Sequence, residues 1–325
     1  VKWQSLGALF AFVIWGLWTA RRHLGEVVRK ATGRSPEVDD SEEMLPYRAA
    51  VISLVLGVLF IILWMSKAGV PFAMIAFIIP TAIILYIALA RFVCESGALF
   101  LNLPATPLEV GYQMVGTTAL SARTIVAAST TTTLPWMLFL PALAQGAKAA
   151  DRIRGNKRAL FWAVLIGLLV AITVNIVIVL SNGYTYGAFN FAEYPFKLYA
   201  PRRIGGMVKT IKNPQIASLP HLIVFIAGAA IMVVLTVIRY RMSTWTLHPI
   251  GYAISTTNIR LQVTSLFAVW VLKSVITRIG GVQLYKHLYP LFLGLIIGRT
   301  AGTLLSFIVD LIWFPGSGHN VHGWA

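Results

Sequence analysis

Seven apolar runs dominate this 325-residue sequence, and each is about as long as a membrane-spanning helix. The hydrocarbon core of a bilayer is about 30 Å thick, so a helix needs about 20 residues to cross it. Lipid offers the backbone no hydrogen-bonding partner, so every run that crosses must be helical. The runs are residues 3–20, 47–66, 71–93, 158–181, 215–238, 258–277 and 288–313.

The composition excludes a water-soluble globular protein. Hydrophobic residues make up 58% of the sequence and charged residues only 12%, and the mean hydropathy is +0.77. Soluble domains are typically 45–50% apolar and about 25% charged. The sequence therefore predicts an all-α polytopic membrane helical bundle with about seven spans, plus a re-entrant or hairpin segment between the third and fourth. We expect three segments: 1–46 (first span and charged linker), 47–157 (two spans and a broken-helix region) and 158–325 (four spans and an aromatic, basic loop at 182–215).

The net charge of +16 reflects membrane topology and does not indicate a nucleic-acid partner. The basic residues lie in short loops beside the apolar runs, where the positive-inside rule counts them. This rule places the clusters after the first run and before the fourth run in the cytoplasm. Alternation then puts Lys67 outside and Arg91, Arg239 and Arg241 inside. We expect the inner, cytoplasmic membrane of a prokaryote.

The region 95–147 is interrupted by glycine and proline and predicts broken or re-entrant helices. Its hydroxyl-rich part, 121–133, includes Thr130 and Thr131, which can satisfy backbone groups that an interruption leaves free. Interrupted helices often build the substrate site of a transporter. Close helix packing by small hydroxyl residues is the other interpretation, and both remain open.

The loop 184–220 combines aromatic and basic side chains. Aromatic rings prefer the headgroup level, and Lys or Arg side chains reach for phosphates. The loop therefore predicts an interfacial, lipid-facing anchor; a docking surface for a ligand or protein is the alternative.

Several short motifs resemble an uncharacterised family of polytopic prokaryotic membrane proteins, defined as paired domains of unknown function. They are Asp39-Asp40-Ser41-Glu42 with Pro46-Tyr47-Arg48, the 90–97 span end, the 147–152 segment, Tyr184-Thr185-Tyr186-Gly187-Ala188 and His248-Pro249-Ile250-Gly251-Tyr252-Ala253. The resemblance implies a distant relation to oligopeptide-transporter-type permeases, with this chain as a C-terminal half. It establishes no activity. Arg299 stands where similar proteins tend to have an acidic residue, and the Thr130 to Thr133 run is absent from them.

Ionisable residues near or within the spans are candidates for a substrate path, because charges in a bilayer are costly unless they pair or line a wet cavity. We hypothesise that Lys273 or Arg299 is neutralised by a carboxylate from another helix, Glu95, Glu109 or Asp310. Snorkelling to the headgroups is the alternative for Lys273 and Asp310, and pairing with backbone carbonyls is the alternative for Arg299. The complete candidate set is Glu95, Glu109, Thr130, Thr131, Lys273, Arg299 and Asp310.

No catalytic constellation or metal framework is recognisable in the sequence. Cys94 is the only cysteine, and His319 and His322 lack a third ligand nearby. We therefore expect no enzyme, metal or cofactor. Two functions remain: a permease-type transporter for a small polar solute or peptide, and a structural or accessory subunit of a larger membrane complex. The expected partners are membrane lipids and either a second copy or other membrane subunits.

Overall fold

The computed structural model describes residues 1–35, 37–96, 103–132, 139–150, 157–190, 197–242, 245, 247–253 and 257–314, and every element in these ranges is a helix. The chain divides into two compact units, Val1–Thr256 and Thr257–Ala325. The first unit contains α1 (Lys2–Thr19), α2 (Arg21–Ala31), α3 (Tyr47–Lys67), α4 (Phe72–Ser96), α5 (Pro107–Val115), α6 (Ala122–Thr131), α7 (Phe139–Ala150), α8 (Lys157–Asn182), α9 (Tyr199–Lys212), α10 (Leu219–Arg241) and α11 (Ile250–Ala253). Two short turns, η2 (Gly183–Gly187) and η3 (Ala188–Asn190), follow α8.

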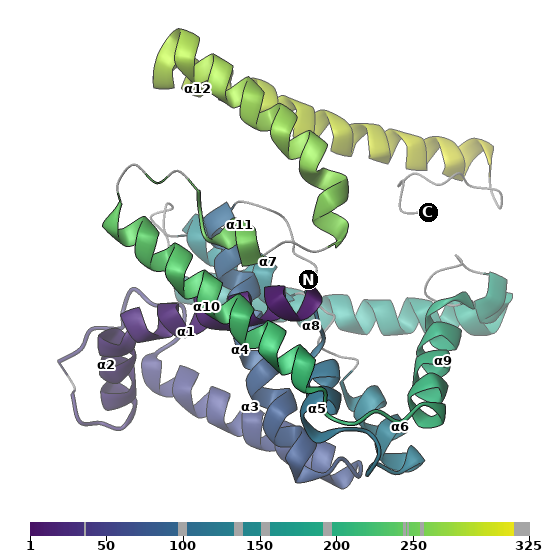
Figure 1. Ribbon diagram of the computed structural model, residues 1–325. Coiled ribbons are helices and arrows are strands. Elements are labelled where there is room, and N and C mark those ends of the chain that lie inside the picture. Colours follow the sequence, from purple (N-terminus) through teal and green to yellow (C-terminus); the bar gives the residue numbers. More distant parts are fainter. Residues whose placement is uncertain are drawn as a thin grey trace. The chain divides into compact units, whose positions relative to one another are not determined.

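The helices α1 and α10 pack side by side and run in the same direction (Figure 1). Ring contacts mark the register: Trp3 stacks on His221, Phe10 meets Phe225 edge-on, and Trp15 stacks on Tyr240. Gly7 and Gly228 allow this approach, because a Cβ at either position would collide with a backbone carbonyl of the opposite helix. Small residues at a helix contact are typical of membrane proteins.

The helix α4 meets the C-terminal half of α1 through Arg91. The guanidinium donates to the carbonyl oxygen of Phe12 at 3.1 Å and lies 4.0 Å from the centre of the Phe12 ring. Arg91 thus lies toward the end of the packed helices where Arg21 follows α1 and Arg241 ends α10. This common end agrees with the direction that the basic residues predict for these three spans.

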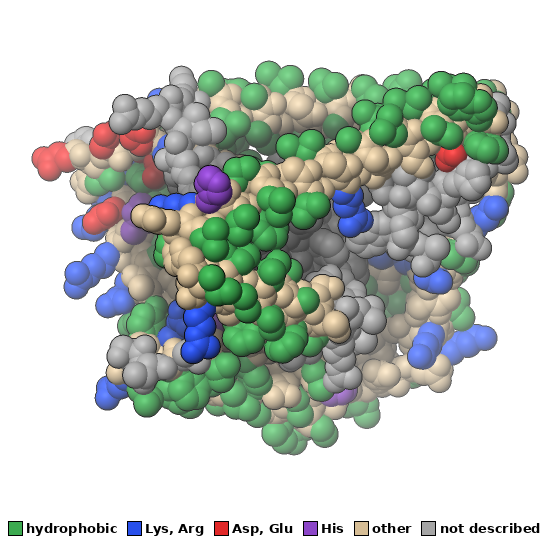
Figure 2. All heavy atoms as spheres, turned by 90° about the horizontal axis from the view of Figure 1, so that it is seen from above, with side chains coloured by type: hydrophobic (Ala, Val, Ile, Leu, Met, Phe, Trp, Pro, Cys, Tyr) green, Lys and Arg blue, Asp and Glu red, His purple; other side chains and the backbone are tan. Residues whose placement is uncertain are grey.

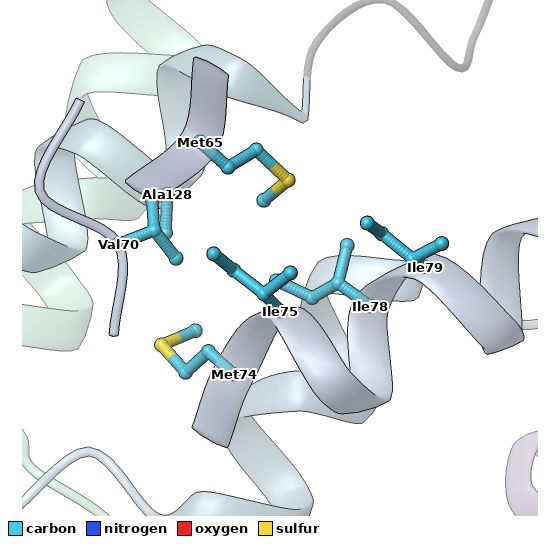
Figure 3. Packing of buried hydrophobic residues seen from close by; sticks show 7 residues of the cluster. All are labelled: Met65, Val70, Met74, Ile75, Ile78, Ile79 and Ala128. Atoms are coloured by element: carbon cyan, nitrogen blue, oxygen red, sulfur yellow. The ribbon is translucent and has the colours of Figure 1, made fainter. Parts of the chain in front are cut away.

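A small apolar core joins α3, α4 and α6 (Figure 3). Met65 from the end of α3 and Val70 from the following turn face Met74 and Ile75 of α4. Ala128 of α6 closes the cluster, and Ile78 and Ile79 extend it along α4. The cluster positions the broken-helix region against the first half of α4.

The described residues between α4 and α8 form short helices, as the glycines and prolines of this region predict. The helices α5, α6 and α7 have 9, 10 and 12 residues, too few to cross a bilayer individually. Both α5 and α7 pack against α4. The predicted broken helices are therefore confirmed within the described residues, whereas re-entry into a membrane stays a prediction.

The second unit consists of α12 (Thr257–Trp313), which Gly281 interrupts with φ 63° and ψ −165°. Its two arms fold back at this residue (Figure 1). The expected spans 258–277 and 288–313 fall in the two arms. The helix is thus broken inside the expected connection between the two spans, at a backbone conformation that only glycine adopts readily.

Five helices of the described chain are long and apolar enough to cross a membrane: α3, α4, α8 with its η turns, α10 and the stretch Val263–Trp313 of α12. The number rises to six if α1 and α2 form one span, but they are bent by 64°. The predicted count of seven is not confirmed, because α1 qualifies only with α2, and Val263–Trp313 is counted as one helix although Gly281 divides it. The more general prediction of a membrane helical bundle, without a number of spans, agrees with these helices.

Hydrophobic side chains dominate the face seen in Figure 2, and acidic side chains gather at its left edge. That edge is where Figure 1 places α2 and the loop after it. The predicted three-segment division follows spans and linkers, whereas the observed division follows contacts and lies at Thr256.

Candidate functional site

The helix α5 begins at a capping box, which fixes the orientation of Glu109. The Thr106 hydroxyl accepts from the Glu109 amide at 3.2 Å, and the Glu109 carboxylate accepts from the Thr106 amide at 3.0 Å. These two bonds satisfy backbone donors that the first turn of a helix otherwise leaves free. Pro107 at the first helical position has no amide to satisfy.

Glu109 also forms an ion pair with the first turn of α1. Its Oε2 lies 2.7 Å from Nζ of Lys2, and both side chains are roughly half exposed. An exposed pair of this kind contributes about 0 to 1 kcal/mol to stability. The contact therefore positions the two helix starts more than it stabilises them.

Gln113, one turn after Glu109, connects α5 to the start of α10. Its Nε2 donates to the carbonyl oxygen of Ser218 at 3.1 Å, and its Oε1 lies 3.2 Å from Nδ1 of His221. The imidazole ring of His221 also stacks on the ring of Trp3, with 5.3 Å between ring centres. Gln113 thus connects α5 to the start of α10, and His221 connects that start to the first turn of α1.

The loop between α9 and α10 is tied to the loop between α5 and α6. The Thr117 amide donates to the Gln215 carbonyl at 2.8 Å, and the Gln215 amide donates to the Thr117 hydroxyl at 2.7 Å. These bonds close one side of a pocket of about 280 Å³. The pocket is lined by Lys2, Trp3, Glu109, Tyr112, Gln113, Thr117, Lys209, Thr210, Asn213, Gln215, Ile216 and His221.

The chemistry of this polar pocket combines one neutralised carboxylate with surplus positive charge. Lys2 and Glu109 pair with each other, so Lys209 supplies a further cation. Side-chain amides and hydroxyls add donors and acceptors. Such a lining can orient a small polar molecule by hydrogen bonds and charge.

Tyr112 links the pocket to α6. Its hydroxyl lies 3.2 Å from Oγ of Ser129 and 3.3 Å from the carbonyl oxygen of Ile125. Burial raises the pKa of the Tyr112 phenol, and the Ser129 hydrogen bond and the charge of Arg203 oppose this shift. Arg203 of α9 itself donates to the carbonyl oxygen of Ser129.

The other carboxylate candidate near a span end, Glu95, lies at the end of α4 and not in the pocket. It accepts two hydrogen bonds from Arg91, at 2.9 and 3.2 Å. Glu95 and Glu109 thus have basic partners within the first unit, Arg91 and Lys2. Neutralisation of Lys273 or Arg299 by Glu95, Glu109 or Asp310 stays a hypothesis.

The threonine candidates use their hydroxyls locally. Thr130 is exposed and donates to the carbonyl oxygen of Val126, and buried Thr131 donates to that of Ala127, both at 2.8 Å. Such bonds to the preceding turn favour helix packing over solute binding for these two residues. Thr133 lies outside the described residues.

Thr131 and Thr132 also line an apolar groove, together with residues of α3 and α4. The groove has a volume of about 410 Å³ and is otherwise lined mainly by aliphatic side chains, with Trp64 and Tyr86. Its chemistry suits lipid tails or a helix, and it offers few groups to a polar solute.

The remaining candidates lie in α12. Nζ of Lys273 is 5.3 Å from the centre of the Tyr285 ring, a cation–π contact between the two arms. Arg299 is exposed and Asp310 is partly buried. Of the seven predicted residues, the structure places only Glu109 in the polar pocket.

The prediction from sequence missed most of this pocket. Lys2, Gln113 and Lys209 are ordinary polar residues in the sequence, and nothing there shows that α1, α5 and α9 meet. One signal was available: the pattern Thr106-Pro107-Leu108-Glu109 is a capping box, and Gln113 follows Glu109 by four residues on the same helix face.

The described residues contain no group of three or more His, Cys, Asp or Glu side chains that could hold a metal ion. His319 and His322 lie outside the described residues, so the structure does not bear on them.

Comparison with known proteins identifies the chain only at the level of a family. No curated protein and no solved structure matches it. A family model covers nearly the whole sequence, residues 1–321, in agreement with the expected uncharacterised family. The chain therefore belongs to the family of unknown function DUF6785.

Proposed function

We propose that this chain is a permease-type, transporter-like membrane protein whose polar pocket receives a small polar solute or a short peptide. One observation carries the proposal: polar side chains from four helices, α1, α5, α9 and α10, converge on one pocket beside an interrupted helix. Broken helices supply such sites in many transporters, because their ends present oriented backbone groups.

The size and chemistry of the pocket favour a small ligand with a negative or zwitterionic group. Its volume of about 280 Å³ lies near the lower end of the range for small-molecule sites, about 300 to 1,000 Å³. Lys209 can attract a carboxylate, and Gln113 and His221 can donate or accept hydrogen bonds. An amino acid or a dipeptide fits these requirements better than a long peptide.

Three further expectations from the sequence belong to the same proposal. They are the distant relation to oligopeptide-transporter-type permeases, the pairing of two halves by a second copy, and the cytoplasmic membrane of a prokaryote. Two copies would supply the two repeats that many secondary transporters contain in one chain.

A ligand panel tests the proposal directly. Purified protein in mild detergent is heated with amino acids, di- and tripeptides or small carboxylates, and thermal stabilisation is measured. A ligand at 100 times its Kd stabilises by about 2.7 kcal/mol, and we expect Lys209→Gln to remove most of this shift. Lys67→Gln, at the exposed end of α3, is the matched control. Stabilising ligands then enter uptake assays in proteoliposomes.

The proposal fails if no compound in the panel stabilises the protein, or if the Lys209→Gln variant responds as the wild type does. A response without uptake would identify a binding protein and contradict transport.

A structural or accessory subunit is the second candidate, and the exposure of α8 favours it. None of the residues in its apolar window is buried, so the helix can face either lipid or helices of another protein. Native mass spectrometry after mild extraction separates these cases. Co-purification with other membrane proteins at fixed stoichiometry would support the subunit, whereas a single chain or homodimer would support the transporter.

A further inference from the structure

The helix α9 exposes an apolar stripe with helical spacing. Ile204, Val208 and Ile211 are 58%, 40% and 37% exposed, and they follow one another at intervals of four and three residues. This spacing places them on one face of the helix. A stripe of three branched aliphatic side chains on a short helix needs an apolar partner.

The opposite part of α9 is attached to the protein. Arg203 is hydrogen-bonded to the Tyr199 hydroxyl and to the carbonyl oxygen of Ser129 in α6, and Lys209 and Thr210 line the polar pocket. The apolar stripe therefore points away from these contacts, and the helix cannot rotate to bury it without breaking them.

The position of α9 in the chain limits where it can lie. It follows α8 and precedes α10, and both of these are long and apolar enough to cross a membrane. Only six residues, 213–218, separate α9 from α10. An extended segment of this length reaches about 20 to 25 Å, so α9 stays near the membrane end of α10.

The charges on α9 are all of one sign. The described stretch 197–242 contains no Asp or Glu, and Arg202, Lys209 and Lys212 are exposed on α9. An amphipathic helix with apolar side chains on one face and Lys or Arg on the other is typical of binding in the plane of an anionic membrane surface. The exposed Tyr184, Tyr186 and Phe189 before it suit the same headgroup layer.

We propose that α9 lies in the membrane–water interface, with Ile204, Val208 and Ile211 among the acyl chains and Arg202 and Lys212 on anionic lipid headgroups. A lipid partner explains the apolar stripe and the positive charge together. The inference holds whether or not the pocket binds a solute.

A spin-label scan of the full chain in nanodiscs tests the placement. Cys94→Ser removes the only cysteine, and single cysteines then replace Ile204, Val208 or Ile211. Gly205→Cys is the control, because a side chain there meets nothing within 4 Å and leaves the helix on its basic side. We expect labels on the stripe to be accessible to oxygen, which concentrates in lipid, and the control label to a water-soluble nickel complex.

Labels on the stripe that are as accessible to the nickel complex as the control label would overturn the proposal. So would stripe labels shielded from both reagents, because a protein, including a second copy of the chain, would then cover the stripe.

A lipid exchange tests the charge. We expect oxygen accessibility of the stripe labels to be about twofold higher or more in nanodiscs with phosphatidylglycerol than in pure phosphatidylcholine. The double variant Arg202→Gln/Lys212→Gln should lose this difference, and Lys67→Gln should keep it. Equal accessibility in the two lipids for the wild-type charges would rule out recognition of anionic headgroups.

Discussion

The helices α4 and α8 are almost equal in length and similarly apolar, yet they occupy opposite environments within the first unit. In α4, 44% of the most apolar window is buried, whereas in α8 none of it is. The difference lies in the neighbours: α4 packs against α1, α3, α5 and α7, whereas among the described residues α8 packs mainly against α7 and the turns that follow it, and its Arg158 donates to the carbonyl oxygen of Asp40. Hydropathy thus predicts that a helix enters a membrane but does not predict whether protein or lipid surrounds it, since lipid tails are as apolar as a protein core.

The largest effect should come from glycines at the contact between packed helices. Gly7→Leu places a side chain against the carbonyl oxygen of Phe225, and we expect it to cost about 3 kcal/mol or more, because backbone must move. Gly167→Leu in α8, where a Cβ meets nothing within 4 Å, should change stability by less than about 0.5 kcal/mol. Thermal stability in detergent, followed by size-exclusion chromatography, measures both.

Equal losses at Gly7 and Gly167 would mean that α8 is covered by protein in the native assembly. That result would contradict the lipid-facing description of α8 and favour the accessory-subunit function.

Core truncation should give the second-largest difference. Ile75 of α4 is 1% exposed in the cluster of Figure 3, and Ile176 of α8 is 54% exposed. We expect Ile75→Ala to cost about 2 to 4 kcal/mol and Ile176→Ala less than about 1 kcal/mol. The same thermal assay compares the two substitutions, which remove the same atoms. A larger loss at Ile176 than at Ile75 would contradict the packing described for α4.

A smaller effect is expected at the polar attachment of α4 to α1. Arg91→Met removes the hydrogen bonds to Phe12 and Glu95 and the cation–π contact, which should cost about 1 to 3 kcal/mol. Arg91→Lys keeps the charge but not the geometry and should recover part of the loss. Lys67→Met is the control and should be nearly neutral. Full stability of Arg91→Met would show that apolar contacts alone hold the two helices together.

The sequence predicts features that depend on residues close together in the chain. It does not predict contacts between residues that are far apart in the chain. Pro107 and Gly116 mark the ends of α5, and Glu95 follows Arg91 by one helical turn, so both patterns are local. By contrast, Lys2 meets Glu109 across more than a hundred residues, and His221 meets Gln113 at a separation of 108. In a membrane protein, no loss of water from apolar surface directs these pairings, so apolar periodicity carries little information about them.

The break in α12 shows the same limit in a different way. The expected spans 258–277 and 288–313 leave residues 278–287 between them without indicating where the helix ends, and the structure interrupts it at Gly281. Charge marks the end of the lipid-compatible sequence. The backbone conformation that glycine permits marks the end of the helix.

The smallest expected effect is a pH dependence at His248, which lies between the packed helix α10 and α11. Burial lowers the pKa of His248, and the charges of Arg239 and Arg91 lower it further, while Glu95 raises it in part. Its Nδ1 accepts a hydrogen bond from the Ile250 amide at 3.2 Å, and protonation of Nδ1 abolishes this bond. The folded state therefore prefers neutral His248.

The sign of the effect follows from linkage. Because the folded pKa lies below the unfolded value of about 6.5, the unfolded state binds more protons between the two values, and stability falls as pH drops through this window. We expect His248→Asn to remove this component, since its side-chain oxygen can still accept from the Ile250 amide but cannot titrate. Thermal midpoints of the two proteins between pH 5 and 8 measure the difference. The two midpoints should agree near pH 8 and diverge on acidification, with the wild type the less stable. Parallel curves would show that His248 is solvated in the folded state and does not pack against α10 and α11.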